Sequence, residues 1–138
     1  MILLWLFLGL LLVSPLIFIT RKLRGKRLVH VMGSSLVIAA LIYIGFAIIW
    51  GDTKWLATEF VGVLLYSAFY WLALQRGLVW LAIGWLLHPA WDAALHLFGP
   101  GAHIAPAWYA WACISFDVVL AAYLLKRSLE KQPMAINT

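Results

Sequence analysis

Charged residues are scarce in this chain. They make up 11% of its 138 residues, whereas 66% are hydrophobic and the mean hydropathy is +1.00. A soluble domain of this length has too little interior to bury so much apolar surface. The composition therefore excludes an ordinary soluble enzyme and predicts an all-α integral membrane protein, built as one polytopic helix bundle.

Cysteines and the common catalytic motifs are missing as well. Cys113 is the single cysteine, so no internal disulfide can form. The sequence contains neither the H-E-x-x-H motif of zinc proteases nor the G-x-S-x-G elbow of serine hydrolases. These absences exclude a disulfide-stapled fold and leave the two hydrolase classes without support.

Long apolar runs, in contrast, are abundant. A helix that spans a bilayer needs roughly 20 apolar residues. Five stretches meet this requirement, at about 2–20, 28–50, 55–75, 78–98 and 106–125. We expect about five transmembrane helices in one bundle over residues 1–127, followed by a short cytoplasmic tail over residues 128–138.

The positive charges alternate between the connections of these stretches. Ten residues are Lys or Arg, and all except Lys54 fall on one predicted side of the membrane. They are Arg21, Lys22, Arg24, Lys26, Arg27, Arg76, Lys126, Arg127 and Lys131. The positive-inside rule then places the N-terminus outside and the C-terminus in the cytoplasm. We expect the protein in the inner membrane of a bacterial cell. The net charge of +5 serves topology and binding to membrane lipid, which argues against a nucleic-acid partner. The oligomeric state stays open, a homo-oligomer included.

Five ionisable groups lie inside the predicted spans, where an ionised side chain costs at least about 2.5–3.5 kcal/mol. They are Glu59, His88, Asp92, His96 and Asp117. We expect all of them to face inward and to satisfy one another. His88, Asp92 and His96 are spaced by four residues, which places them on one helical stripe about 12 Å long. By depth, Glu59 should lie level with Asp92. Asp117 should lie level with His88.

Three nearby residues have a simpler interpretation. Tyr66 and Tyr70 follow Glu59 on much the same helical face, and we expect inward packing with a partner for each hydroxyl. Cys113 precedes Asp117 by one turn. Because the chain has no second thiol, Cys113 is interpreted as a small packing residue and not as a ligand.

The stretch IGWLLHPAWDAALHLFG resembles the signature of DUF6010, a family of small bacterial membrane proteins without an assigned activity. That signature reads G-W-L-L-H-x-x-W-D-x-x-H-H-L-x-G, with a glutamate in the preceding span and C-x-x-C-D in the following one. The matching residues are Glu59, Gly84, Trp85, His88, Trp91, Asp92, His96, Gly99, Cys113 and Asp117. Leu95 and Phe116 replace the first histidine of the pair and the second cysteine, so no role of those two family positions applies here. The resemblance covers about residues 55–125 and implies a site, without implying a reaction.

The chemistry of the five groups favours a transition metal. Imidazole and carboxylate ligands suit zinc, iron or copper, and the ligand pool would be His88, Asp92, His96, Glu59 and Asp117. Among these, the carboxylates of Asp92, Glu59 and Asp117 are the catalytic candidates, to orient a histidine or to act as general base. Haem is disfavoured because His88 and His96 share one helix and cannot clamp a haem from opposite sides. The expected substrate is a lipophilic small molecule that enters from the outer face.

Three other functions remain open at this point. Trp85 and Trp91 flank the site in sequence, and a metal-free acid/base pocket lined by aromatic rings would suit a carbocation or an ammonium group, as in sterol-isomerase-like membrane proteins. A ladder of titratable groups also fits a proton or ion path. That path is weakened because only Tyr66, Ser67 and Tyr70 continue it toward the cytoplasm. A structural accessory subunit is the remaining alternative, and the sequence does not decide whether the protein is an enzyme.

Overall fold

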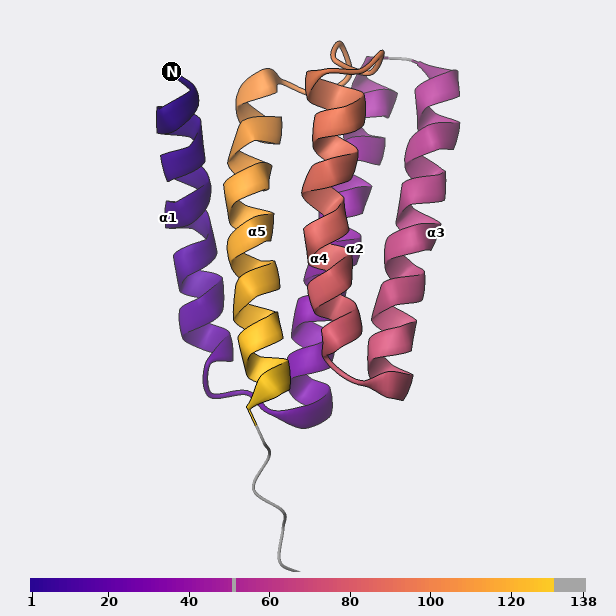
Figure 1. Ribbon diagram of the computed structural model, residues 1–138. Helices are drawn as coiled ribbons and strands as arrows, with labels where there is room; N and C mark the ends of the chain where they lie inside the picture. Colours follow the sequence, from indigo (N-terminus) through magenta and orange to yellow (C-terminus); the bar gives the residue numbers. More distant parts are fainter. Residues whose placement is uncertain (51, 131–138) are drawn as a thin grey trace, which may run out of the picture.

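The computed structural model describes residues 1–50 and 52–130 and consists of helices throughout the described part (Figure 1). The helices are α1 (Ile2–Thr20), α2 (Gly25–Ile49), α3 (Thr53–Arg76), α4 (Val79–Asp92) and α5 (Ala107–Leu129). A π-helical turn, η1 (Ala93–Leu97), continues α4 directly. The predicted all-α bundle is confirmed. Of the predicted tail, residues 131–138 lie outside the described residues.

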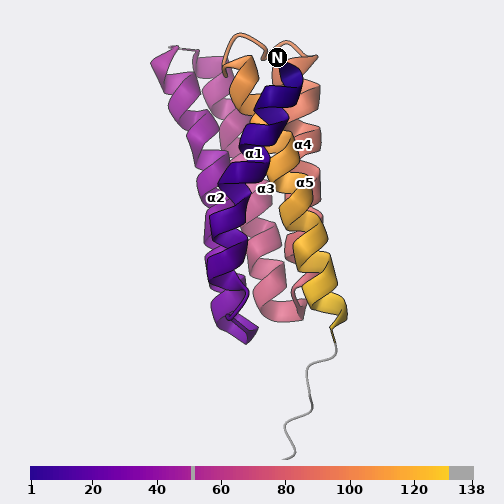
Figure 2. The same ribbon diagram turned by 90° about the vertical axis from the view of Figure 1, so that its left-hand side faces the viewer.

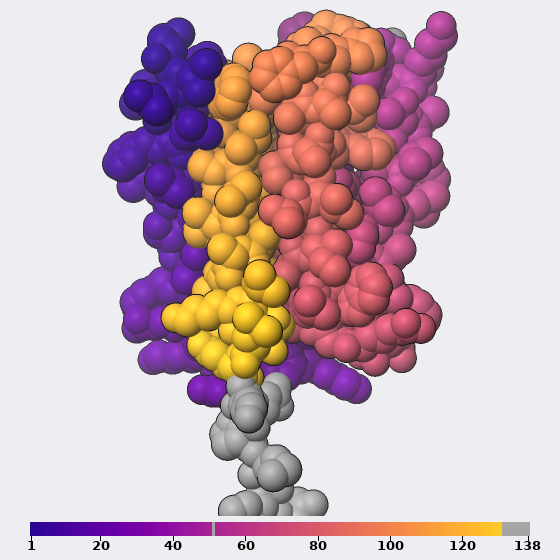
Figure 3. Space-filling model, in the orientation of Figure 1, coloured from indigo at the N-terminus to yellow at the C-terminus, as the bar shows by residue number. Residues whose placement is uncertain are grey.

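The helices stand side by side in one bundle. Figure 1 shows α1, α5, α4 and α3 in that order across the view, with α2 behind them. The main packing pairs are α2 with α3, α1 with α5, and α4 with both α5 and α3. In the space-filling view, α5 and α4 form the middle of this face between α1 and α3 (Figure 3). The central position of α4 explains why its side chains can meet those of α3 and α5.

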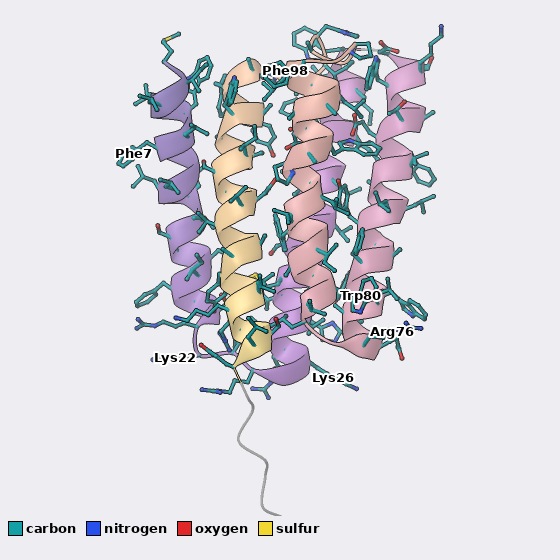
Figure 4. All side chains as sticks on the ribbon, in the orientation of Figure 1. Phe7, Lys22, Lys26, Arg76, Trp80 and Phe98 are labelled. Carbon is teal, nitrogen blue, oxygen red and sulfur yellow. The ribbon has the colours of Figure 1, made fainter. Side chains whose placement is uncertain are left out.

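Four helices are long and apolar enough to cross a membrane, namely α1, α2, α3 and α5. The fourth predicted stretch is divided, because α4 has 14 residues before η1 begins. Large apolar side chains cover the outward surfaces of the bundle, as lipid contact requires. These features identify a multi-pass membrane protein. Its orientation remains a prediction, although Lys22, Lys26 and Arg76 lie together at one end of the bundle (Figure 4).

Local features fix the ends of the helices. Asp52 caps α3, since its Oδ1 accepts hydrogen bonds from the backbone N–H groups of Lys54 at 3.2 Å and Trp55 at 3.4 Å. Gly77 ends the same helix with a φ of +116°, a conformation that side-chain-bearing residues rarely adopt. At the same end of the bundle, Arg127 donates to the Leu23 carbonyl at 2.6 Å, which ties α5 to the α1–α2 connection.

Small residues let α1 approach α5 closely. A Cβ at Gly9 would collide with the backbone carbonyl of Ala112. Ser115 Oγ adds a hydrogen bond across the same contact, to the Leu6 carbonyl at 2.7 Å. In lipid, the hydrophobic effect does not drive helices together. Close backbone approach and interhelical hydrogen bonds of this kind hold them together instead. The α1–α5 contact is therefore the main attachment of α1 to the bundle.

Candidate metal site in the bundle core

The five ionisable side chains of the predicted spans all lie inside the bundle. Glu59 on α3, His88 and Asp92 on α4, His96 on η1 and Asp117 on α5 are each at most 2% exposed. The expectation that these groups turn away from lipid is confirmed. Burial of ionisable groups is costly unless they pair or bind a cation, so their partners decide what the site can do.

His88 and Asp117 form the closest pair. His88 Nδ1 donates a hydrogen bond to Asp117 Oδ2 at 2.7 Å. The same nitrogen lies 3.5 Å from Asp92 Oδ2, one turn further along α4. The prediction that Asp117 lies level with His88 is confirmed. The other ring nitrogen, His88 Nε2, is buried and has no hydrogen-bond partner among the described residues.

These three residues have the geometry of a metal site. Each offers a ligand atom, and the three atoms lie within 4.8 Å of one another. Donor atoms bound to one tetrahedral ion at about 2.0–2.1 Å lie roughly 3.3 Å apart. The separations of 2.7 Å and 3.5 Å from His88 Nδ1 to the two carboxylates fall on either side of that value, so the three residues could hold one ion. Three protein ligands leave a fourth position for water or substrate, which is the arrangement of catalytic zinc sites.

Glu59 and His96 form a second pair outside this group. His96 Nε2 lies 2.8 Å from Glu59 Oε1, and His96 Nδ1 donates to the Gly101 carbonyl at 3.1 Å. Trp91 Nε1 donates to the other Glu59 oxygen at 3.4 Å. The predicted ligand pool of five thus divides into a triad (His88, Asp92 and Asp117) and a dyad (Glu59 and His96).

The π-helical turn accounts for this division. The N–H of Phe98 bonds to the Ala93 carbonyl, five residues back, at 3.0 Å. The wider turn rotates His96 relative to a regular α-helix, whose spacing was the basis of the predicted single stripe. Glu59 therefore pairs with His96, a contact that matching depths along regular helices did not predict. Single π turns occur frequently at functional sites.

Asp92 is the carboxylate without a counter-charge of its own, because the His88 nitrogen 3.5 Å away is hydrogen-bonded to Asp117. His88 faces Asp117 directly and His96 faces Glu59, while no Lys or Arg side chain is paired with any of these groups in the described part of the chain. Asp92 is 0% exposed, and neither of its oxygens has a hydrogen-bond partner in residues 1–50 and 52–130. Such a carboxylate must hold a proton or bind a cation. Asp92 therefore decides between metal and proton chemistry.

Two tyrosines complete the site, and sequence reasoning missed one of them. Tyr43 on α2 is 1% exposed, and its ring stacks on His96 with centroids 4.4 Å apart and planes at 18°. The Tyr66 ring lies 4.9 Å from that of His88. An isolated tyrosine in the apolar run LIYIGF was the available signal, since a buried hydroxyl needs a partner.

The sequence predicted a hydrogen-bond partner for the hydroxyls of both Tyr66 and Tyr70, and the structure provides one for Tyr70 alone within the described residues. Tyr70 finds the expected one, with His30 Nδ1 at 2.6 Å from its hydroxyl. Tyr66 does not, because its buried hydroxyl lacks a hydrogen-bond partner within the described residues. All buried side-chain N and O atoms without such a partner, in the part of the chain that the structure describes, belong to Tyr43, Glu59, Tyr66, His88, Asp92 and His96. Unsatisfied atoms concentrated in one place indicate a site that binds an ion, water or ligand.

The comparisons with known proteins place the chain in a family. No curated protein and no solved structure matches it. Residues 2–130 match the model of a family of unknown function, DUF6010. The match extends beyond the segment of about 55–125 on which the sequence resemblance rested, and it includes every residue of the triad and the dyad. The chain therefore belongs to the DUF6010 family.

Proposed function

We propose that the triad holds one divalent transition-metal ion, zinc, iron or copper, and that the site acts on a lipophilic small molecule within the membrane. Asp92 carries this proposal, because it is a fully buried carboxylate that shares the single imidazole of His88 with Asp117 and has no hydrogen-bond partner within the described residues. A divalent ion would neutralise two carboxylates at once and would bind the imidazole as well.

In this proposal the dyad moves protons beside the ion. The Nδ1–H of His96 is committed to the Gly101 carbonyl, so His96 Nε2 is the atom that exchanges a proton with Glu59 Oε1. The ion would polarise an oxygen of the substrate at its open fourth position. A proton donor and acceptor in the same buried core would then serve general acid–base catalysis. Asp117 and Asp92 act as ligands, and Glu59 acts as the base.

A metal-free acid/base pocket is the second candidate function. Aromatic rings surround His88, with centroids at 4.9 Å for Tyr66, 6.0 Å for Tyr43 and 6.4 Å for Trp85. Rings together with carboxylates favour a cationic intermediate or an ammonium group. In that case Asp92 holds a proton, and the site acts without an ion.

Metal analysis of the purified protein separates these functions. Wild-type protein, His88→Ala and His30→Ala would be purified in parallel in the same detergent and assayed for zinc, iron and copper. His30 is a matched control, because it is a histidine on α2 whose bonding partner is Tyr70. The proposal expects one ion per chain in the wild type and in His30→Ala, and none in His88→Ala. Wild-type protein that stays metal-free after incubation with each ion would contradict it.

A further inference from the structure

A groove runs along the side of the bundle between α1, α2 and α5. Its volume is about 460 Å³, within the roughly 300–1,000 Å³ typical of small-molecule sites. Figure 2 shows α1 in front, with α2 to one side and α5 to the other. The lining is mainly apolar, and it includes Leu12, Ala39, Ile42, Ala112 and Phe116.

The groove opens on the side of the bundle, where α1 and α2 present apolar surface to lipid. α1 packs on α5 while α2 packs on α3, so α1 and α2 do not close on each other. Leu12 and Ile38 lie on the groove in the middle of their helices, and they are 54% and 56% exposed. α1 and α2 are both long and apolar enough to cross the membrane. A molecule dissolved in the hydrocarbon core can therefore enter sideways.

The inner end of the groove reaches the candidate site. Trp85, Cys113 and Asp117 line it, and Asp117 Oδ2 accepts the hydrogen bond from His88 Nδ1. Asp117 is therefore shared between the groove and the triad. This route enters from the membrane, whereas the sequence predicted entry from the outer face.

The charges of the groove lining restrict the chemical class of molecule that can bind there. It contains no Lys, Arg or His, and its ionisable groups are the acid Asp117, Cys113 and Tyr109, in the part of the chain that the structure describes. A phosphate head group would find no counter-charge there and would face a carboxylate. An apolar chain fits the walls, and a small neutral oxygen function fits the polar inner end. The occupant is therefore not a phospholipid.

We infer that the groove admits a long-chain molecule with a hydroxyl or carbonyl end from the bilayer and brings that end to Asp117. What happens to that end rests on the proposed function, because an ion held by the triad would bind its oxygen. Entry into the groove itself depends only on the shape and chemistry of the lining. The two can therefore fail separately.

Photochemical labelling tests this inference. Protein in lipid nanodiscs would be irradiated with a diazirine-bearing long-chain alcohol, and the labelled positions would be mapped by mass spectrometry. We expect labels within residues 35–42 and 108–117, suppressed by excess unlabelled long-chain alcohol and unaffected by excess phosphatidylglycerol. Labels spread over all lipid-facing helices, or displaced by phosphatidylglycerol, would overturn the inference.

Two matched variants sharpen the test. Ala39→Trp places an indole in the groove, and labelling there should fall to the level of the sample kept in the dark. Ala68→Trp makes the same change at an exposed position of α3 and should keep the wild-type pattern. Unchanged groove labelling in a folded Ala39→Trp would overturn the inference. If that variant does not fold, the wild-type map and its competition pattern decide.

Metal content measured on the same samples separates the two proposals. Metal-free protein that is labelled in the groove would retain the entry route and reject the proposed metal function. Metal-loaded protein without groove labelling would reject the entry route and retain the metal. Ala39→Trp should keep its metal, because Ala39 lies on the groove and supplies no ligand atom.

Discussion

His96 Nε2 lies 2.8 Å from Glu59 Oε1, in the core of the bundle and next to the triad. The other ring nitrogen donates its hydrogen to the Gly101 carbonyl, so Nε2 is the ring atom of His96 left to exchange a proton with Glu59. Neither residue belongs to the group of ligand atoms that lie within 4.8 Å of one another. The pair is therefore expected to support the ion without binding it.

Substitutions of Glu59 test this separation. Glu59→Gln keeps a side chain that can hydrogen-bond to His96 Nε2, and it should retain the full metal content. Glu59→Leu removes the carboxylate that faces His96 Nε2 and leaves the Trp91 N–H without its acceptor, which should lower the free energy of unfolding by about 1–3 kcal/mol. Thermal unfolding in detergent and metal analysis of both variants provide the check. Loss of metal from Glu59→Gln would make Glu59 a ligand and would contradict the division into triad and dyad.

Tyr43 should stabilise the site through its ring and not through its hydroxyl. The ring stacks on His96, and stacked aromatic pairs contribute about 0.5–1.5 kcal/mol beyond their buried area. Tyr43→Phe keeps the stack and should unfold like the wild type, whereas Tyr43→Leu should be less stable by about that amount. Both would be measured by thermal unfolding. A Tyr43→Phe variant that loses metal or stability would show that the hydroxyl contributes to the site.

The Asp52–His103 pair predicts a pH dependence at the end of the bundle. His103 Nε2 lies 3.1 Å from Asp52 Oδ2, and its hydrogen bond, followed by those from the backbone of Trp55 and Lys54, lowers the pKa of Asp52. A carboxylate whose pKa is lower in the folded state contributes stability above its ordinary pKa of about 3.9. That contribution disappears as the pH falls through the lowered value.

Asp52→Asn isolates this contribution because the amide oxygen still caps α3. At neutral pH the variant should melt at a lower temperature than the wild type, and the difference should vanish on acidification. Melting curves recorded over a pH series for both proteins provide the check. A difference that persists unchanged at the acidic end would contradict the assigned cause.

Membrane topology is a separate prediction. Met1 and the end of α5 lie at opposite ends of the bundle (Figure 1). With the basic connections inside, the N-terminus is expected outside and the C-terminus in the cytoplasm. A fluorescent reporter that folds only in the cytoplasm, fused after Thr138, should be bright, and alkaline phosphatase at the same position should be inactive. The reverse pattern would contradict this orientation.

Sequence reasoning reached the helices and the triad for identifiable reasons. Charge is so costly in lipid that Glu59 and Asp117 had to turn inward, whatever the details of packing. Depth along straight α-helices was sufficient to match His88 with Asp117. Both inferences depend on the direction and length of whole helices, and local changes of the backbone alter these little.

The remaining features depend on local geometry that one sequence does not reveal. The π turn at 93–97 gave His96 a different partner, and nothing in AALHL distinguishes it from an α-helical segment. Tyr43 stacks on His96 because α2 lies next to the core of the bundle, behind α4 in Figure 1. Hydropathy does not specify this arrangement. The groove likewise follows from α1 packing on α5 instead of α2.

The charge on Asp92 is the central question, and Asp92→Asn tests it most directly. The decisive measurement is metal content per chain, with melting temperature before and after zinc addition, in wild type and in Asp92→Asn. If the triad binds an ion, the wild type carries it and is stabilised by zinc, whereas Asp92→Asn carries none and does not respond. If Asp92 merely holds a proton, Asp92→Asn is at least as stable as a wild type that is metal-free and indifferent to zinc, and that result would contradict the account.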